Sequence, residues 1–330
     1  MNMKRILYIG CAALLLASCS KVAVTVEEPL PQEPLPENPP EVVEPVKDVF
    51  HATFAQDGTK TMLSEDLEFL WNEDDEISLF RASTYNREYV FDGMDESEAG
   101  DFYEINSPEE RQVMFSEKPM DRNYAVYPYM SSKHIALSSS AILTIDLPSV
   151  QTYRENSVGR GANVMTAVTE DTDSRNLVFK NTSGYLKINL YGEGVVLRSV
   201  TLTSNGGEKL SGKAEIPLEY GVMPVIEMQN SKTYDYVTLS SEEGIELGAT
   251  KETATAFWFV VPPVTFSSGF TLSATGFYGG DFTKSAPMNF SVERNKYYNI
   301  APLQVTLSGG SMGVGISGWE NSASYSGTTD

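Results

Sequence analysis

From residue 48 onward, apolar and polar residues alternate in short runs. Phe50, Ala52 and Phe54 occupy every second position, and similar spacing recurs at 77–79, 89–91, 113–115, 125–127 and 142–146. Alternation over about four to eight residues is typical of β-strands that bury one face. Turn-forming residues such as those at 56–58, 73–75 and 91–93 separate the runs. No stretch sustains the 3.6-residue period of a long amphipathic helix, so the pattern predicts an all-β fold.

A second set of strand-like runs follows the polar segment 169–174, at 177–180, 185–191, 195–203, 234–239, 256–261 and 270–276. Many short strands separated by turns favour β-sandwiches. We therefore predict two tandem β-sandwich domains, at 48–170 and 171–306. The run at 256–261 is apolar at every position and ends at Pro262 and Pro263, which predicts a central strand.

The first residues predict a secretory signal. Lys4 and Arg5 precede an apolar run at 6–16, which is too short for the roughly 20 residues of a membrane-spanning helix. The sequence Leu-Ala-Ser-Cys at 16–19 is similar to a bacterial lipobox. Residues 1–18 are therefore predicted to be a lipoprotein signal peptide, with Cys19 as the acylated first residue of the mature protein. Because Ser20 rather than Asp follows the cysteine, we expect the outer membrane.

Residues 19–47 differ in composition from the rest of the chain. Seven of the 17 prolines lie there, separated mostly by Glu and Leu. Such a segment favours extended polyproline II, so it is predicted to be a semi-rigid tether. At the other end, residues 307–330 are rich in Gly and Ser and are interpreted as a tail or a donor segment.

The net charge of −21 argues against nucleic-acid binding through a basic face. Signal removal would discard Lys4 and Arg5 and no acidic residue, giving −23. The hydrophobic content of 41% predicts a folded core. Cys11 and Cys19 are the only cysteines, so no disulfide is expected in the exported part. We expect no metal, no cofactor and no enzymatic activity.

Candidate chemistry is sparse. Residues 309–313 match the G-x-S-x-G spacing of a hydrolase, but no helix pattern and no His follow Ser311, so a flexible tail is favoured. His51 and His134 are the only possible imidazole bases and are interpreted as surface or half-buried residues. The acidic runs at 73–76 and 170–173 lack the spacing of a calcium loop and are interpreted as solvated loops.

In order and spacing, several motifs resemble the fimbrillin family of Bacteroidetes lipoproteins over residues 48–306. They are Lys60-Thr61, Trp71 with Asp74-Asp75-Glu76-Ile77, Tyr124 to Tyr129, Phe179-Lys180-Asn181, Val260 to Pro263, Gly269-Phe270 and Arg294-Asn295-Lys296. The resemblance implies two transthyretin-like β-sandwich domains and export as a surface lipoprotein. It also implies a structural, anchor or tip subunit of a type V pilus (a fimbrium) that supports adhesion and biofilm growth.

The resemblance further implies assembly with other pilus subunits by strand exchange, after an arginine-specific protease removes the amino-terminal strand. Phe50, Ala52 and Phe54 are then candidate side chains of the displaced strand. The candidate donor segment carries Ile300, Leu303, Val305 and Leu307, or extends along the tail to Trp319. The family pattern is not matched at the protease site, because no Arg lies between Cys19 and the first predicted strand. Either a different protease acts, near Lys47 or within the first domain, or the lipid stays and the chain is an anchor or accessory subunit.

A second hypothesis is a surface glycan-binding lipoprotein of a polysaccharide-uptake system. It requires exposed aromatic side chains, for which Trp319, Tyr124, Tyr127 and Tyr129 are the candidates. Trp71 and Trp258 lie in strand-like runs and are predicted to be core residues. In both hypotheses the lipid tethers the protein to a membrane. For the pilus subunit, the other expected partners are further pilus subunits and a host or bacterial surface receptor. A secreted hydrolase is the third hypothesis, because the sequence offers no good candidate for a catalytic general base.

Overall fold

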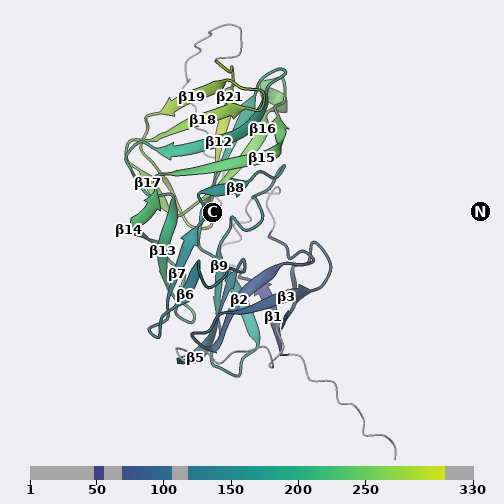
Figure 1. The fold of residues 1–330 in the computed structure, drawn as a ribbon, viewed down its shortest axis with the longest axis vertical. Helices are drawn as coiled ribbons and strands as arrows, with labels where there is room; N and C mark the ends of the chain where they lie inside the picture. Colours follow the sequence, from purple (N-terminus) through teal and green to yellow (C-terminus); the bar gives the residue numbers. More distant parts are fainter. Residues whose placement is uncertain (1–47, 56–68, 106–117, 309–330) are drawn as a thin grey trace, which may run out of the picture. The chain divides into compact units, whose positions relative to one another are not determined.

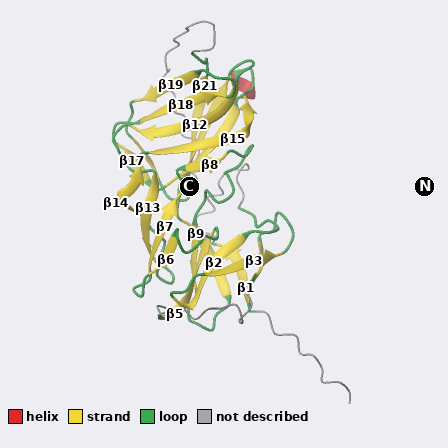
Figure 2. Ribbon diagram, viewed as in Figure 1, coloured by secondary structure: helices red, strands yellow, loops and turns green. Residues whose placement is uncertain are grey.

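The computed structural model describes residues 48–55, 69–105 and 118–308. In this part of the chain the fold is built from strands β1 to β21 and a single turn of 3-10 helix at Lys251–Thr253 (Figures 1 and 2). The all-β prediction is therefore confirmed. The described residues all belong to one compact unit.

The first sheet closes on itself. In order around the sheet, its strands are β1 (Val49–Phe54), β10 (Asn176–Asn181), β9 (Met165–Val168), β5 (Pro119–Tyr127), β2 (Glu76–Ser83), β3 (Arg87–Asp92) and β4 (Ala99–Glu104), with β4 returning to β1. An interior aromatic cluster fills it, with Phe50, Trp71, Tyr89, Phe102 and Phe179 each at most 1% exposed. We expected a two-sheet sandwich for this region, whereas its hydrogen bonding forms one continuous ring.

Two further sheets share one apolar core. The three-stranded sheet has the order β16 (Thr255–Val261), β11 (Gly184–Tyr191), β21 (Tyr297–Gln304). The five-stranded sheet has the order β19 (Asp281–Ala286), β18 (Phe270–Gly276), β12 (Val196–Ser204), β15 (Tyr236–Glu246), β8 (Val150–Thr152). Leu186 and Phe259 from one sheet join Val200 and Leu272 from the other in a single buried cluster, the arrangement by which two sheets bury their inner faces.

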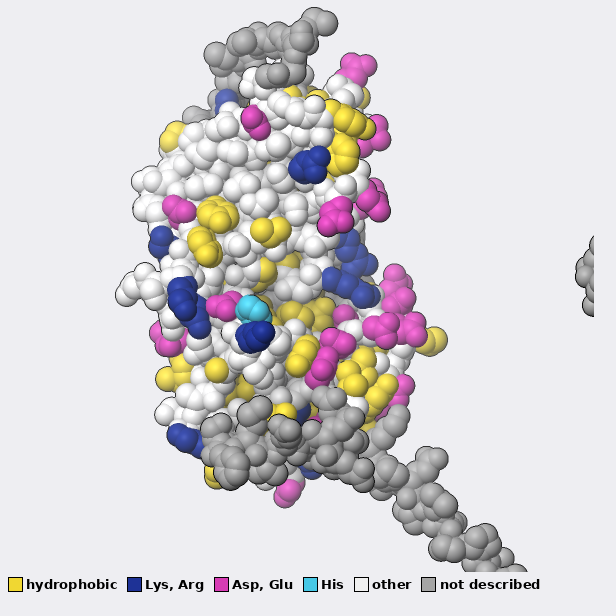
Figure 3. All heavy atoms as spheres, in the orientation of Figure 1, with side chains coloured by type: hydrophobic (Ala, Val, Ile, Leu, Met, Phe, Trp, Pro, Cys, Tyr) yellow, Lys and Arg dark blue, Asp and Glu magenta, His cyan; other side chains and the backbone are white. Residues whose placement is uncertain are grey.

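A four-stranded sheet covers part of the first one. Its order is β14 (Glu227–Tyr234), β13 (Ser211–Pro217), β7 (Ile142–Leu147), β6 (Ile135–Leu137). Leu143, Ile145 and Ile216 pack with Phe80 and Val126, which point outward from β2 and β5 of the closed sheet. A short pair, β17 (Val264–Phe266) with β20 (Phe290–Val292), completes the strands. Charged and apolar side chains are interspersed on the face seen in Figure 3.

The predicted central strand is an edge strand, which corrects the sequence interpretation. Within residues 48–55, 69–105 and 118–308, β16 pairs only with β11, yet residues 256–261 are buried. The side chain of Gln151 explains how this edge is satisfied: its Nε2 donates to the carbonyl of Val260 at 2.7 Å, and its Oε1 accepts from the amide of Val260 at 3.1 Å. Since Gln151 is 4% exposed, its side chain replaces a neighbouring strand at that point.

Strand pairings cross residue 170 in both directions. β10 joins the closed sheet beside β1 and β9, and β8 joins the five-stranded sheet beside β15. Side-chain bonds also link the two sides, including Asn163 Nδ2 to Asn181 Oδ1 at 2.7 Å and Tyr185 Oη to Asn163 Oδ1 at 2.8 Å. The division into domains at 48–170 and 171–306 stays a prediction.

Candidate functional site

The candidate displaced strand is a fully paired member of the closed sheet. β1 lies antiparallel to β4, with Phe50 opposite Phe102 and His51 opposite Asp101. On its other side β1 runs parallel to β10, with Thr53 opposite Val178. The backbone of β1 is therefore bonded along both edges, and without it the ring would open between β4 and β10.

Side chains alternate along β1 as the sequence predicts. Phe50 and Ala52 point inward and are 0% exposed, and Phe54 is partly buried at the end of the strand. The ring of Phe50 meets that of Tyr89 edge-on, with centroids 5.7 Å apart. Phe54 stacks on Trp71 at 4.6 Å between centroids. These inward groups fill the interior of the sheet, and a replacement strand would have to fill the same spaces.

A charged cluster holds the start of β1. Asp48 forms ion pairs with Arg81 at 2.5 Å and Arg175 at 3.5 Å, and it accepts a hydrogen bond from the Tyr89 hydroxyl at 2.9 Å. Burial, followed by the negative charge of Asp48, raises the pKa of Tyr89 well above its usual value. The guanidinium of Arg175 also lies 4.9 Å from the centroid of Phe50. These contacts hold the amino-terminal end of β1 in the closed sheet.

The candidate donor segment is paired within its own chain. Ile300 and Leu303 belong to β21, which runs parallel to β11 at the edge of the three-stranded sheet. Val305 is 2% exposed, and Leu307 packs against the same core as Ile300 and Leu303. To act as a donor, this segment would have to leave β11.

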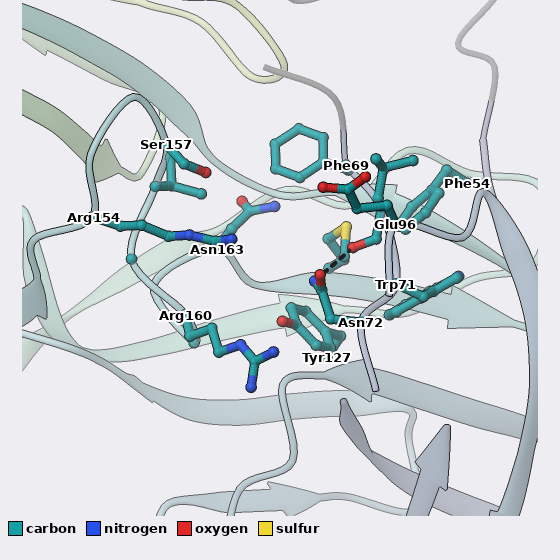
Figure 4. Close-up of a pocket in the computed structure, with 15 residues that line it drawn as sticks. Phe54, Phe69, Trp71, Asn72, Glu96, Tyr127, Arg154, Ser157, Arg160 and Asn163 are labelled. Atoms are coloured by element: carbon teal, nitrogen blue, oxygen red, sulfur yellow. Dashed lines mark hydrogen bonds between the residues drawn. The ribbon is translucent and has the colours of Figure 1, made fainter. Parts of the chain in front are cut away.

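A pocket of about 190 Å³ lies where β1 ends (Figure 4). We call it the arginine pocket, and its principal lining residues are Phe54, Phe69, Trp71, Tyr127, Arg154 and Arg160. In Figure 4 the two arginines extend from the loop between β8 and β9, on the side of the pocket opposite Phe54 and Trp71. Sequence reasoning missed this site.

The loop that carries the two arginines is closely packed. Gly159 lies against the backbone of Thr152, where a Cβ on the glycine would come within 2.2 Å of the Thr152 carbonyl oxygen. The amide of Ala162 donates to the carbonyl of Gly159 at 3.1 Å. A glycine is therefore required at this close approach, which fixes the path of the chain between Arg154 and Arg160.

A buried carboxyl group stands behind the arginine pocket. Asp75 is 5% exposed and accepts hydrogen bonds from the amide of Asn72 at 2.8 Å and the hydroxyl of Tyr127 at 3.2 Å. Burial raises the pKa of Asp75, and the bonds from Asn72 and Tyr127 and the charge of Arg160 oppose that rise. Arg160 is therefore close enough to act electrostatically on Asp75, although no ion pair joins the two.

Of the aromatic residues that the sequence singled out, Trp71 and Tyr127 line the arginine pocket, and Tyr124, Tyr129 and Trp258 do not. Trp71 and Trp258 are each 1% exposed, which confirms them as core residues. Tyr124 is 3% exposed, so its expected role on an exposed aromatic platform is wrong: the four-stranded sheet packs over it. Tyr129 is partly exposed and does not line the arginine pocket.

His51 pairs with Asp101 at 2.8 Å, and His134 pairs with Asp146 at 3.2 Å. Neither histidine lines the pocket. Among the described residues, no cluster of three or more His, Cys, Asp or Glu side chains is arranged to hold a metal, and no helix is long and apolar enough to cross a membrane. Cys19, Lys47, Ser311 and Trp319 lie outside the described residues.

No family model matches the chain, and no curated protein matches it. Several solved structures match the chain. One described as a "putative cell adhesion protein" from Bacteroides uniformis has 17% identity and a TM-score of 0.44, covering 79% of this chain and 94% of that one. A second, with the same description, from Bacteroides ovatus, has 14% identity and a TM-score of 0.41, covering 70% and 82%. The tip fimbrial protein Mfa3 from Porphyromonas gingivalis has 9% identity and a TM-score of 0.29, covering 76% and 92%.

These neighbours are described as cell adhesion and fimbrial proteins, the class that the sequence motifs resemble. All three TM-scores are below 0.5, so the likeness carries no inference about function.

Proposed function

We propose that the chain is a fimbrillin-like cell-surface lipoprotein that serves as a structural, anchor or tip subunit of a type V pilus and supports adhesion. In this proposal Cys19 carries the lipid at the outer membrane, residues 19–47 tether the folded part, and subunits join by β-strand exchange. Two tandem transthyretin-like domains belong to the same proposal.

The position of β1 is the observation that carries this proposal. β1 is the first described strand, its inward side chains Phe50 and Ala52 are completely buried, and its two neighbours are β4 and β10. Loss of such a strand exposes two unpaired backbone edges and empty side-chain sites, which is the arrangement that accepts an added strand. β1 has six residues, and its length sets the length of the gap between β4 and β10 that an incoming strand would fill.

The bounds of β1 limit where a protease has to cut. Cleavage after Lys47 detaches the tether but leaves β1 joined to the rest of the chain, since β1 begins at Val49. Release of β1 requires a cut after Phe54 and before β2. The first basic residue in that interval is Lys60, so strand release calls for a protease that accepts Lys or another residue.

A disulfide that locks β1 to β4 tests the exchange. His51 and Asp101 are directly opposite and their exposed side chains already meet at 2.8 Å, so His51→Cys with Asp101→Cys places two thiols at bridging range. The matched control is Thr201→Cys with Thr238→Cys, which bridges β12 and β15 at a pair whose hydroxyls lie 2.8 Å apart. No cysteine follows Cys19 in the sequence.

The readout is the SDS-resistant ladder formed by protein isolated from cells. We expect the oxidised His51→Cys/Asp101→Cys protein to lose the ladder, a reductant to restore it, and the control pair to ladder in both states. If the oxidised His51→Cys/Asp101→Cys protein still formed the ladder, β1 would have to stay in place during assembly. That result would overturn strand exchange at this site. The amino-terminal residue of the same material separates the lipid-anchored form from the cleaved form.

The second candidate function is a surface glycan-binding lipoprotein. The aromatic and basic lining of the arginine pocket favours it, because sugar rings pack on aromatic faces and their acidic groups pair with arginine. Binding to a glycan array by protein that forms no ladder would favour this function over the pilus subunit.

A further inference from the structure

The two arginines of the arginine pocket differ from the other described arginines in their side-chain contacts. In the described ranges, Arg81, Arg87, Arg122 and Arg175 form ion pairs with acidic side chains, and Arg198 and Arg294 donate to backbone carbonyls. Arg154 and Arg160 have no side-chain hydrogen bond or ion pair to any described residue. In a chain with 45 acidic and 24 basic residues, two guanidinium groups in one pocket without an ion pair to a described acidic side chain indicate a site for an external anion.

The arginine pocket also offers partly apolar surface. Phe54, Phe69 and Tyr127 are each partly exposed and line the pocket. Behind them, Trp71 is 1% exposed and its indole N–H has no hydrogen-bond partner among the residues described. A buried donor without a partner is costly, and this one belongs to a residue that lines the pocket. The pocket therefore combines ring surface with cationic donors.

Acidic groups at the pocket limit what it accepts. Glu96 lines the rim and is exposed, and Asp75 is buried behind Tyr127. A second negative charge on the ligand would be repelled by Glu96, whereas hydroxyl groups would find an acceptor in that carboxylate. This selects a ligand with a single acidic group and several hydroxyls. The volume of about 190 Å³ is below the roughly 300 Å³ at which drug-sized sites begin, so it suits one ring.

We propose that the arginine pocket binds the carboxylate of one acidic sugar residue, a hexuronic acid in a surface polysaccharide. Arg154 and Arg160 pair with the carboxylate, the sugar ring lies against Phe69 and Tyr127, and Glu96 accepts from ring hydroxyls. This inference deepens the adhesive role proposed above by naming the chemistry of its receptor, and it rests on that role only for its biological purpose.

A matched pair of ligands tests the assignment. Methyl β-D-glucuronide and methyl β-D-glucoside differ only in the carboxylate, and acetate supplies the carboxylate without the ring. Titration of the purified full-length protein, followed by NMR or calorimetry, gives the three affinities. We expect the glucuronide to bind with a Kd in the millimolar range, about tenfold or more tighter than both the glucoside and acetate, because charge-assisted bonds and ring contacts each contribute.

Arginine variants connect that binding to the pocket. Arg154→Gln and Arg160→Gln alter exposed side chains and should each weaken glucuronide binding about tenfold. Arg198→Gln, an exposed arginine that lies over Phe277, makes the same charge change and should leave the affinity unaltered. Circular dichroism and melting temperature verify that each variant is folded.

Several results would overturn the assignment. They are no saturable binding of the glucuronide at tens of millimolar, equal binding of glucoside and glucuronide, tighter binding of inorganic phosphate or of an acidic peptide, or wild-type affinity in both pocket variants. Ladder formation is measured on the same proteins. Normal ladders without glucuronide binding reject only the pocket, and glucuronide binding without ladders rejects only the strand-exchange role.

Discussion

Replacing Phe50 by Ala tests whether β1 is held mainly by its inward side chains. Phe50 is 0% exposed, its ring meets Tyr89 edge-on, and the guanidinium of Arg175 lies 4.9 Å from its centroid. Truncation of a buried Phe to Ala typically costs about 3–5 kcal/mol, because transfer free energy is lost and a cavity remains. We place Phe50→Ala in the upper half of that range, because the edge-on contact and the cation–π contact are lost together.

The matched control is Val178→Ala on the neighbouring strand β10. Val178 is 45% exposed and should change the free energy of unfolding by less than about 1 kcal/mol. Urea unfolding of both variants, monitored by circular dichroism, gives that free energy from the transition midpoint and slope. A loss below about 1 kcal/mol for Phe50→Ala, with an unchanged slope, would refute the conclusion that the inward face of β1 is part of the core. In the strand-exchange proposal the same variant should also form ladders faster, since its own strand is held less firmly.

Other predictions concern groups outside β1. Burial alone would raise the pKa of Glu208, but hydrogen bonds from Ser204 and Ser267 outweigh it and lower that pKa to about 2; the stabilising effect of Glu208 is therefore present above its ordinary pKa of 4.5 and is lost as pH falls towards 2. The difference in unfolding free energy between wild type and Glu208→Gln should thus shrink between about pH 6 and pH 3, and a constant difference would contradict this. Trp258→Phe should cost less than about 1.5 kcal/mol in urea unfolding, because the indole N–H that it removes is buried without a partner in the described structure; a cost equal to that of Trp258→Ala, about 3–5 kcal/mol, would show that the N–H is bonded. Asn123→Ala should cost about 2–3 kcal/mol, because the two N–H bonds of its buried amide are shared among three carbonyls of the loop 171–174, and hydrogen exchange should increase in that loop; unchanged exchange would count against the assignment.

How much of the fold the sequence predicts depends on whether a strand has one buried face. Runs such as 185–191 and 270–276 alternate clearly, and the structure places β11 and β18 there. β14 and β19 were missed because most of their side chains are polar and exposed, so pairing with β13 and β18 makes them strands. The edge position of β16 was missed because a run that is buried on both faces does not indicate how many strands pair with it. The Gln151 side-chain amide that bonds to the backbone of Val260 is 109 residues away in the sequence.

The displaced strand and the arginine pocket differ in what a sequence can indicate about them. Phe50, Ala52 and Phe54 share one strand, so local alternation places them together on one face. The pocket instead collects Phe54, Trp71 and Tyr127 from separate strands and loops and faces them with two arginines of the loop between β8 and β9. No spacing rule relates those positions, because they come together only when the loop between β8 and β9 folds against the end of β1 and the segment before β2. The only local signal is Gly159 between the two arginines, a residue whose tight packing becomes evident only once its neighbour Thr152 is placed. The arginine pocket is therefore evident only in the folded structure, where two arginines without an ion pair to a described residue face these rings.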